Sequence, residues 1–466
     1  MKSALIALAG PTLIGICMLF VLAGCDPCGS CPVEVVTATA THTPGPTHTP
    51  APTRTATPKP TPSPSPTSLA PTATPTLAPE ACLPSSSISV LVAGSNATVY
   101  VPEGRWGAGP SGVEVVPIET KSGIGTGGAV TTVATPNTVN SCSSNSNTGQ
   151  TVCVANNTDT YLITGSTLNT TVASGATGNE SFSGGSCQNC GVVVDSSINK
   201  ALVTIGLETG GPGGYQFLDL GTTPAFETAI PAGASTSEDA SIDPVRHLVL
   251  SPNEAGNYQI LDVSGGTTKA QLFNNHVTGS PVFDSAGEDC TTGIALSTIE
   301  FTGNLFIADL KQAKFDSTAG TWTDTGSQVQ TFPEFTSLAA GTCGIAVAPG
   351  LHVGIVTGEF GGNIEGVIAL PATSGSGVPA IPDWVQFTVP DLPDGTAFSM
   401  GFDPHTVTAY VSPNSGKGLG VLVSDGSAGT PHFLAVVDLE GLLSAPRTGH
   451  IVNTIPAGVI TFVKVM

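Results

Sequence analysis

The stretch Ser241–Ser264, SIDPVRHLVLSPNEAGNYQILDVS, reads as one strand–loop–strand unit. Asp243-Pro244 predicts a turn, because proline holds φ near the value that a turn requires. The run His247–Leu250 predicts a short apolar strand, and Tyr258–Val263 predicts a second one. Ser251–Asn257 is polar and indicates the loop between them. The unit is therefore a β-hairpin bounded by turns, with no helical period in it.

This unit recurs along the chain, and internal repeats decide the architecture of a long sequence. Copies cover Asp195–Leu220 and Asp403–Leu439, looser ones cover Thr292–Leu310 and Gly344–Leu370, and weak ones cover Asn96–Glu119 and Gln150–Gly165. The residues that follow the first strand of each copy are Glu103, Asn157, Glu208, Glu254, Glu300, Glu359 and Asn414. These positions are 46 to 59 residues apart, a spacing that suits one four-stranded blade per repeat.

The repeated pattern has an Asp turn, a strand, an SP-N loop and a strand that ends in Asp. It resembles the YVTN/NHL/WD40-like repeat propellers over most of Ser85–Met466, although the GH…WD dipeptides of true WD40 repeats are missing. The resemblance implies an all-β fold: a single β-propeller of about seven four-stranded blades over residues 82–466. Gly449–Val465 holds two further strands, one of which is expected to pair with the first blade and close the ring.

The N-terminus predicts export and a membrane anchor. Lys2 precedes an apolar run, Ala4–Ala23, that is typical of a secretory signal. Leu22-Ala23-Gly24-Cys25 resembles the lipobox of bacterial lipoproteins, which implies a signal peptide over residues 1–24 and a lipid on Cys25. The alternative is an ordinary signal peptide or a transmembrane helix; a break at Gly10-Pro11 argues against the helix.

Residues 25–36 form the short lipidated N-terminus, and residues 37–81 are rich in Thr, Pro, Ala and Ser. Such a composition has too little apolar surface to form a core, and its prolines favour extended polyproline II. We therefore predict a disordered linker between the anchor and the propeller.

The formal net charge is −21, with 34 acidic and 13 basic residues. This charge disfavours nucleic acid and direct contact with anionic lipid, and it permits cationic partners or divalent metals. Solubility alone is the alternative reason for so acidic a chain.

The chain has eleven cysteines, which should be largely oxidised in an exported protein. Proximity in sequence predicts the disulfides Cys142–Cys153, Cys290–Cys343 and Cys187–Cys190. A thioredoxin-like reading of the last pair requires a βαβ context, and a zinc reading requires a second CxxC pair nearby. Both contexts are missing from the sequence.

The repeat supplies one chemical hypothesis. Equivalent loop positions in a propeller recur around one face, so a ring of oxygen ligands could line the channel mouth. Its carboxylates would be Glu103, Glu208, Glu254, Glu300 and Glu359. Such a ring suits calcium or a cationic ligand. The alternative is that these side chains simply point into solvent, as polar loop residues do.

No catalytic histidine with an acidic partner is visible in the sequence. His247 and His352 share one register, seven residues before Glu254 and Glu359, so His and Glu of one blade fall on opposite faces. We therefore expect these histidines to be structural.

These observations predict a lipid-anchored, extracytoplasmic propeller that is a non-catalytic binding or scaffolding module for a protein, a glycan or a divalent cation. Trp106 is the candidate exposed aromatic residue for partner binding. Two alternatives stay open: a metal-dependent hydrolase or lactonase, and a structural protein of the cell envelope.

Overall fold

The chain divides into two units, Met1–Ala70 and Pro71–Met466, and every residue described below belongs to the second. The computed structural model describes residues 87–103, 111–124, 130–155, 157–173, 189–205, 214–231, 239–253, 257–264, 282–300, 302–312, 314–316, 321–323, 327–331, 341–358, 364–371, 381–389, 406–423, 432–444 and 462–465.

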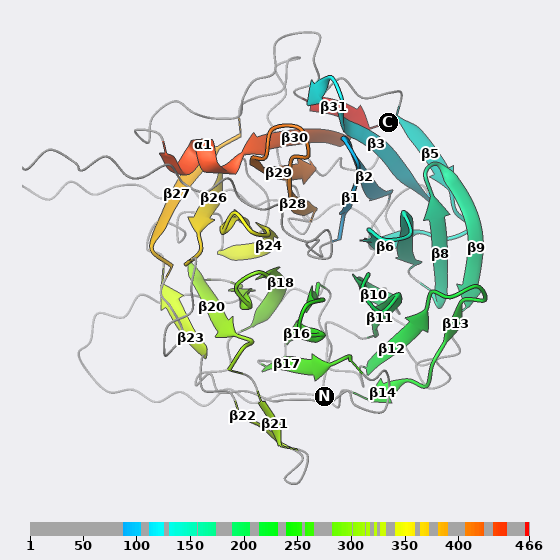
Figure 1. The fold of residues 1–466 in the computed structure, drawn as a ribbon, viewed down its shortest axis with the longest axis horizontal. Helices are drawn as coiled ribbons and strands as arrows, with labels where there is room; N and C mark the ends of the chain where they lie inside the picture. Colours follow the sequence, from blue (N-terminus) through cyan, green and yellow to red (C-terminus); the bar gives the residue numbers. More distant parts are fainter. Residues whose placement is uncertain are drawn as a thin grey trace, which may run out of the picture. The chain divides into compact units, whose positions relative to one another are not determined.

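The second unit is a seven-bladed β-propeller built from antiparallel sheets (Figure 1). Blade 1 contains β1 (Ser89–Ala93), β2 (Asn96–Glu103) and β3 (Gly112–Thr120), with β4 (Gly123–Ile124) and β5 (Thr131–Ala134) both paired to β3. Blade 2 contains β6 (Val139–Asn145), β7 (Gln150–Ala155), β8 (Asp159–Thr164) and β9 (Thr167–Ala173). Blade 3 contains β10 (Asn189–Asp195), β11 (Lys200–Ile205), β12 (Gly214–Asp219), β13 (Ala225–Phe226) and β14 (Ile230–Pro231).

The remaining four blades follow in chain order. Blade 4 contains β15 (Ser241–Asp243), β16 (Leu248–Asn253) and β17 (Asn257–Asp262). Blade 5 contains β18 (Phe283–Asp289), β19 (Ile294–Ile299), β20 (Asn304–Asp309) and β23 (Ser327–Thr331), with a separate hairpin of β21 (Lys314–Asp316) and β22 (Thr321–Thr323). Blade 6 contains β24 (Thr342–Ala348), β25 (Val353–Gly358), β26 (Ile364–Ala369) and β27 (Asp383–Thr388). Blade 7 contains β28 (Val407–Val411), β29 (Gly418–Val423), β30 (His432–Asp438) and β31 (Phe462–Val465).

The first strand of each blade is its inner strand, nearest the axis (Figure 1). We call the end of the ring where the inner strands begin the entry end, and the end where they turn into the second strands the turn end. The predicted all-β fold and the blade number are confirmed.

Of the two strands expected in Gly449–Val465, the described one, β31, does not pair with the first blade, and the other lies outside the described residues. β31 pairs with β30 of its own blade, with His432 opposite Val465. In blade 1, β4 and β5 already occupy the outer edge of β3. Among the described residues, blades 1 and 7 meet through side-chain packing and through hydrogen bonds such as that from Asn414 Nδ2 to the carbonyl oxygen of Ser95.

The core consists of seven layers, each between two neighbouring blades. Between blades 4 and 5, for example, Tyr258 packs against Phe283 and Phe306, with ring centroids 5.9 and 4.3 Å away. Because side chains of a strand alternate between its two faces, a blade that is covered on both faces buries nearly every residue. This explains the uninterrupted aliphatic runs of the sequence.

A short helix, α1 (Leu439–Ser444), follows β30, and its Leu439 and Leu442 pack into the layer between blades 6 and 7. Within the described part of the chain, no helix combines the length and hydropathy needed to cross a membrane.

Candidate functional site

The predicted Glu/Asn ring does not form as it was aligned. Glu103, Asn157 and Glu300 do end or follow the second strands of blades 1, 2 and 5. Asn414 instead follows the inner strand β28, which places it at the turn end, opposite to the others. The misleading signal is the tripeptide Ser-Pro-Asn, which lies in the second strand of blade 4 at residues 251–253 and after the inner strand of blade 7 at 412–414. Glu208, Glu254 and Glu359 lie outside the described residues.

Glu103 is engaged inside its own blade. Its side chain hydrogen-bonds Glu114 on β3, and Thr132 on β5 donates to Glu114 Oε1 at 3.1 Å. Burial, followed by the hydrogen bond and the charge of Glu114, raises the pKa of Glu103 to about 8. Gly112 is needed for this approach, because a Cβ there would lie 2.5 Å from Glu103 Oε2.

No group of three or more His, Cys, Asp or Glu side chains that could hold a metal is found within the described ranges. The predicted calcium ring thus has no assembled ligand set in this part of the chain.

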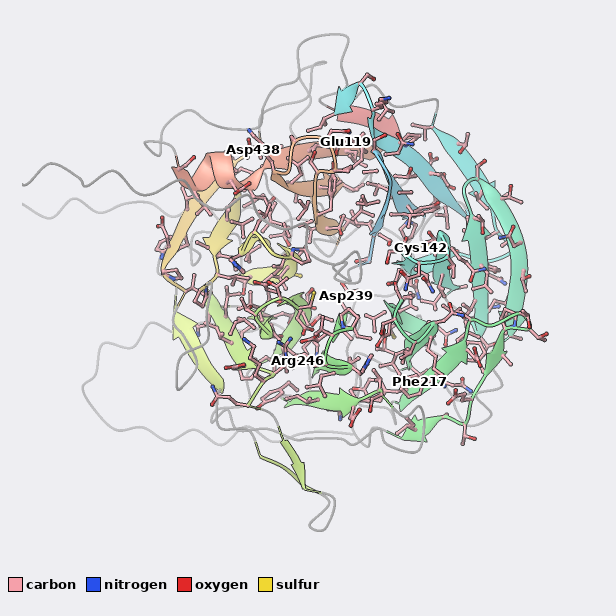
Figure 2. The ribbon with its side chains drawn as sticks, viewed as in Figure 1. Glu119, Cys142, Phe217, Asp239, Arg246 and Asp438 are labelled. Carbon is pink, nitrogen blue, oxygen red and sulfur yellow. A yellow bond between two sulfur atoms is a disulfide. The ribbon has the colours of Figure 1, made fainter. Side chains whose placement is uncertain are left out.

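Two buried aspartates outside the predicted ring lie where inner strands begin. Ser87, just before β1 of blade 1, donates to Asp239 Oδ2 at 3.2 Å, just before β15 of blade 4. Blades 1 and 4 are not neighbours, so this contact places both residues at the centre of the entry end, where Figure 2 shows Asp239. Asp284, at the start of β18, accepts a hydrogen bond from Cys343 Sγ at 2.6 Å. Both aspartates are only 2% exposed.

Bulges at the start of the inner strands turn side chains at this end. β10, β18 and β24 each carry an irregularity in their first residues, and bulges commonly re-aim side chains near functional sites. In each case a threonine hydroxyl of the second strand accepts the bulge backbone N–H, at 2.7–3.0 Å. The pairs are Thr204 with Gly191, Thr298 with Ser285 and Thr357 with Gly344. This recurring threonine is a signal that the sequence contained.

At the turn end, a capping residue closes four of the seven inner strands. Four inner strands end in Asn or Asp, whose Oδ1 accepts the backbone N–H two residues on at 2.9–3.1 Å. The donor–acceptor pairs are Asn147–Asn145, Ser197–Asp195, Val245–Asp243 and Thr291–Asp289. These Asx turns explain the repeated Asp of the sequence, as turn chemistry predicts.

The same capping residues also reach the next blade. The Nδ2 of Asn145 donates to Asn199 Oδ1 at 2.8 Å. Asp195 Oδ2 lies 2.7 Å from His247 Nδ1, and Asp289 Oδ2 lies 2.5 Å from His352 Nδ1. We call these contacts inter-blade staples. They join blades 2 to 3, 3 to 4 and 5 to 6.

The stapled partners share an unusual backbone conformation. Asn199, His247 and His352 have φ values of 56°, 56° and 57°, in the left-handed region that non-glycine residues seldom occupy. Each lies directly before the second strand of its blade, where blades 2 and 5 have Gly149 and Gly293.

Arg246 makes the equivalent connection between blades 4 and 5 (Figure 2). Its Nη1 pairs with Asp243 Oδ2 and donates to the carbonyl oxygen of Cys290 at 2.9 Å. The guanidinium fills the space where a side chain at Gly293 would stand, since a Cβ there would lie 2.9 Å from Arg246 Cζ.

His247 and His352 each have an acidic partner that was not visible in the sequence, because it comes from the preceding blade. The sequence could not reveal it, since Asp195 and His247 lie 52 residues apart. The hydroxyl groups of Ser197 and Thr291 also donate hydrogen bonds to Oδ1 of Asp195 and of Asp289, respectively. These bonds cap the two turns. Two copies of one constellation at equivalent turns support a role in blade packing.

Among the cysteines, Cys142 and Cys153 form the predicted disulfide, directly opposite each other on β6 and β7. Cys190 and Cys290 are disulfide-bonded as well, and Cys187 lies outside the described residues. The predicted Cys290–Cys343 bridge is wrong, because Cys343 keeps its thiol. Cys343 is near the start of β24 and Cys290 follows the end of β18. Inner strands run in one direction, so the two are about 20 Å apart along the axis.

No protein-family model matches the chain, and a search of curated proteins finds no matching sequence. Two further predicted sites, the lipidated Cys25 and the aromatic Trp106, lie outside the described residues.

Proposed function

We propose that this chain is an exported, lipid-anchored β-propeller that acts as a non-catalytic binding or scaffolding module. The lipobox-like Leu22-Ala23-Gly24-Cys25 supports the anchor. The Cys142–Cys153 disulfide supports an oxidising, extracytoplasmic compartment. The linker over residues 37–81 would hold the ring on the order of 100 Å from the membrane at about 3.1 Å per residue.

The entry end is the proposed binding end. The observation that carries this assignment is the pair of buried carboxylates where inner strands begin, Asp239 at the axis and Asp284 beside Cys343. Long stretches of sequence precede some of the inner strands, and long connections commonly carry recognition. Examples are residues 174–188 before β10 and 389–406 before β28. The turn end has short, stapled turns between inner and second strands, at residues 146–149, 196–199, 244–247 and 290–293.

Charge indicates the kind of partner. The chain carries a net charge of −21, and the axial side chains are carboxylates. A partner that brings a cationic group, either a basic protein segment or a divalent cation, would be attracted to this end.

The anchor is tested in a bacterial host that expresses the full chain and its Cys25→Ser variant. Wild type should fractionate with membranes and carry a lipid on the N-terminal Cys25 in mass spectra of the mature protein. The variant should lose both properties. A wild-type chain that is recovered without lipid would refute the anchor.

The binding end is tested by the melting temperature of the purified mature chain with calcium and, separately, with an oligolysine peptide. One of these probes should raise the melting temperature in a concentration-dependent way, as ligands of the native state do. Asp239→Asn should reduce the rise, whereas the exposed Asp219→Asn should not. No rise with either probe, or the same rise in both variants, would contradict the assignment.

A further inference from the structure

Blade 5 departs from the repeat at one buried position. In blades 2 to 6, the residue just before the last residue of the inner strand lies between blades. Blades 3 and 4 have Val194 and Ile242 there, blade 6 has Val347 and blade 2 has the small Ser144. Blade 5 has Glu288, which is 4% exposed. A buried carboxyl in a place that otherwise takes an aliphatic side chain is costly, and such departures concentrate at sites with a function.

Glu288 faces blade 4. Ser241 Oγ on β15 donates to Glu288 Oε2 at 3.3 Å. The neighbouring Gly287 lies on the opposite side of β18, against Ile345 of blade 6. Glu288 Oε1 is buried and accepts no hydrogen bond from a donor among the residues that the structure describes.

The charged groups around Glu288 do not balance if it is ionised. β15 contributes Asp243, which is fully buried, and the following turn contributes Arg246. On β19 the residue opposite Glu288 is Ala295, and β16 contributes Leu248 and Leu250 to this layer. Arg246 is already committed to Asp243 and to the carbonyl oxygen of Cys290. One guanidinium therefore faces two carboxyl groups, and a metal cation beside it would be repelled.

We propose that Glu288 is a proton-dependent latch between blades 4 and 5. As a neutral acid it donates a hydrogen bond to Asp243 and holds the two inner strands together. When it loses its proton, two buried carboxylates face each other and the contact between the blades opens at the turn end. The remainder of this layer consists of aromatic and aliphatic side chains, among them Tyr258, Phe283 and Phe306.

The electrostatics agree with this geometry. Burial raises the pKa of Glu288 well above its usual 4.5, and the charge and hydrogen bond of Asp243 raise it further. The charge of Arg246 offsets only part of this rise. In the unfolded chain Glu288 ionises near 4.5. Its contribution to stability is therefore fully present below that pH and is lost as the pH rises toward the raised value.

The experiment measures urea unfolding of the mature chain from pH 5 to pH 9, for wild type, Glu288→Gln and Glu288→Val. Between the pKa of Glu288 in the unfolded chain and its raised pKa in the folded chain, the residue loses its proton only on unfolding. In this pH range the unfolding equilibrium constant of wild type should rise about tenfold per pH unit relative to either variant. Glu288→Val reproduces the residue type of blades 3 and 6. Ser241→Ala is the matched control, because it removes a contact of Glu288 without removing the proton, and it should keep the wild-type slope.

A second measurement needs no variant. Amide hydrogen exchange of wild type, corrected for its intrinsic pH dependence, should show β15 and β18 opening more readily at pH 9 than at pH 6. The equivalent strands β6 and β10 should not change. Parallel pH profiles for wild type and both variants, or equal exchange behaviour in the two pairs of blades, would overturn the proposal.

Discussion

The residues that precede the second strands show how one backbone conformation can be filled in different ways. Glycine adopts a positive φ without penalty, whereas other residues lose about 1–2 kcal/mol there. Asn199, His247 and His352 occupy this conformation and are each bound by the capping residue of the preceding blade. The staples supply interactions that offset the backbone strain.

Gly293→Ala should destabilise the protein by about 2–3 kcal/mol, because the backbone penalty adds to the displacement of the Arg246 guanidinium. Gly149→Ala is the matched control. It has a similar φ of 70°, but an added Cβ meets nothing within 4 Å, so only the backbone penalty of about 1 kcal/mol should appear. Urea unfolding measures both. Equal losses of unfolding free energy in the two variants would show that the position of Arg246 does not depend on the absence of a side chain at residue 293.

Asp289 is expected to give an acid-sensitive staple. Burial raises the pKa of Asp289, but hydrogen bonds from His352 and Thr291 more than offset this, so that its pKa lies below 3.8. Its contribution is therefore present above pH 3.8 and is lost as the pH falls through the lowered value. Asp289→Asn should lower the free energy of unfolding by about 1–2 kcal/mol at pH 7. The difference from wild type should shrink toward pH 3, and a difference that is constant from pH 3 to pH 7 would be the contrary result.

At the scale of the element, the Cys142–Cys153 disulfide joins β6 and β7 within blade 2 across 11 residues of sequence. Closing a loop of this size stabilises a fold by about 2–3 kcal/mol. The Cys142→Ala/Cys153→Ala double variant should lose about that much in urea unfolding. Cys343→Ser retains a hydrogen-bond donor for Asp284 and breaks no disulfide, so its free energy of unfolding should fall by less. An unaffected double variant would mean that the strand pairing alone holds this hairpin.

At the scale of the whole molecule, the contact between blades 7 and 1 has a special role, because none of the described strands is shared between these two blades. Glu119 on β3 is fully buried (Figure 2) and accepts hydrogen bonds from blade 7. The donors are Tyr410 Oη at 2.9 Å, Ser412 Oγ at 2.6 Å and Asn414 Nδ2 at 3.0 Å. The turn that follows β28 of blade 7 is thus connected to blade 1 through the Glu119 carboxylate.

Glu119→Ala should lower the free energy of unfolding by about 3 kcal/mol, because it leaves buried donors without an acceptor. Tyr410→Phe should lose about 1 kcal/mol alone and little more in the double variant, since both changes remove the same contact. Additive losses in this double-mutant cycle would contradict the closing role of Glu119.

Much of the fold could be predicted from the sequence, because a blade is a local object. The Asp-Pro turn at residue 243 and the strands at Leu248–Asn253 and Asn257–Asp262 lie close to their predicted places. Local periodicity also predicted the number of blades. Register between blades was harder, since Ser-Pro-Asn occurs on different strands of blades 4 and 7. Asn414 was consequently assigned to the wrong end.

The sequence by itself determined the β-strands, their turns and the Cys142–Cys153 pair, because each depends on residues that are near one another in the chain. Only the tertiary structure decided what meets between blades: Asp195 with His247, Glu119 with Tyr410, and Ser87 with Asp239 across the axis. The physical reason is that a propeller brings together residues one or more repeats apart. The energy of a buried polar side chain depends on that distant partner, which no local pattern specifies.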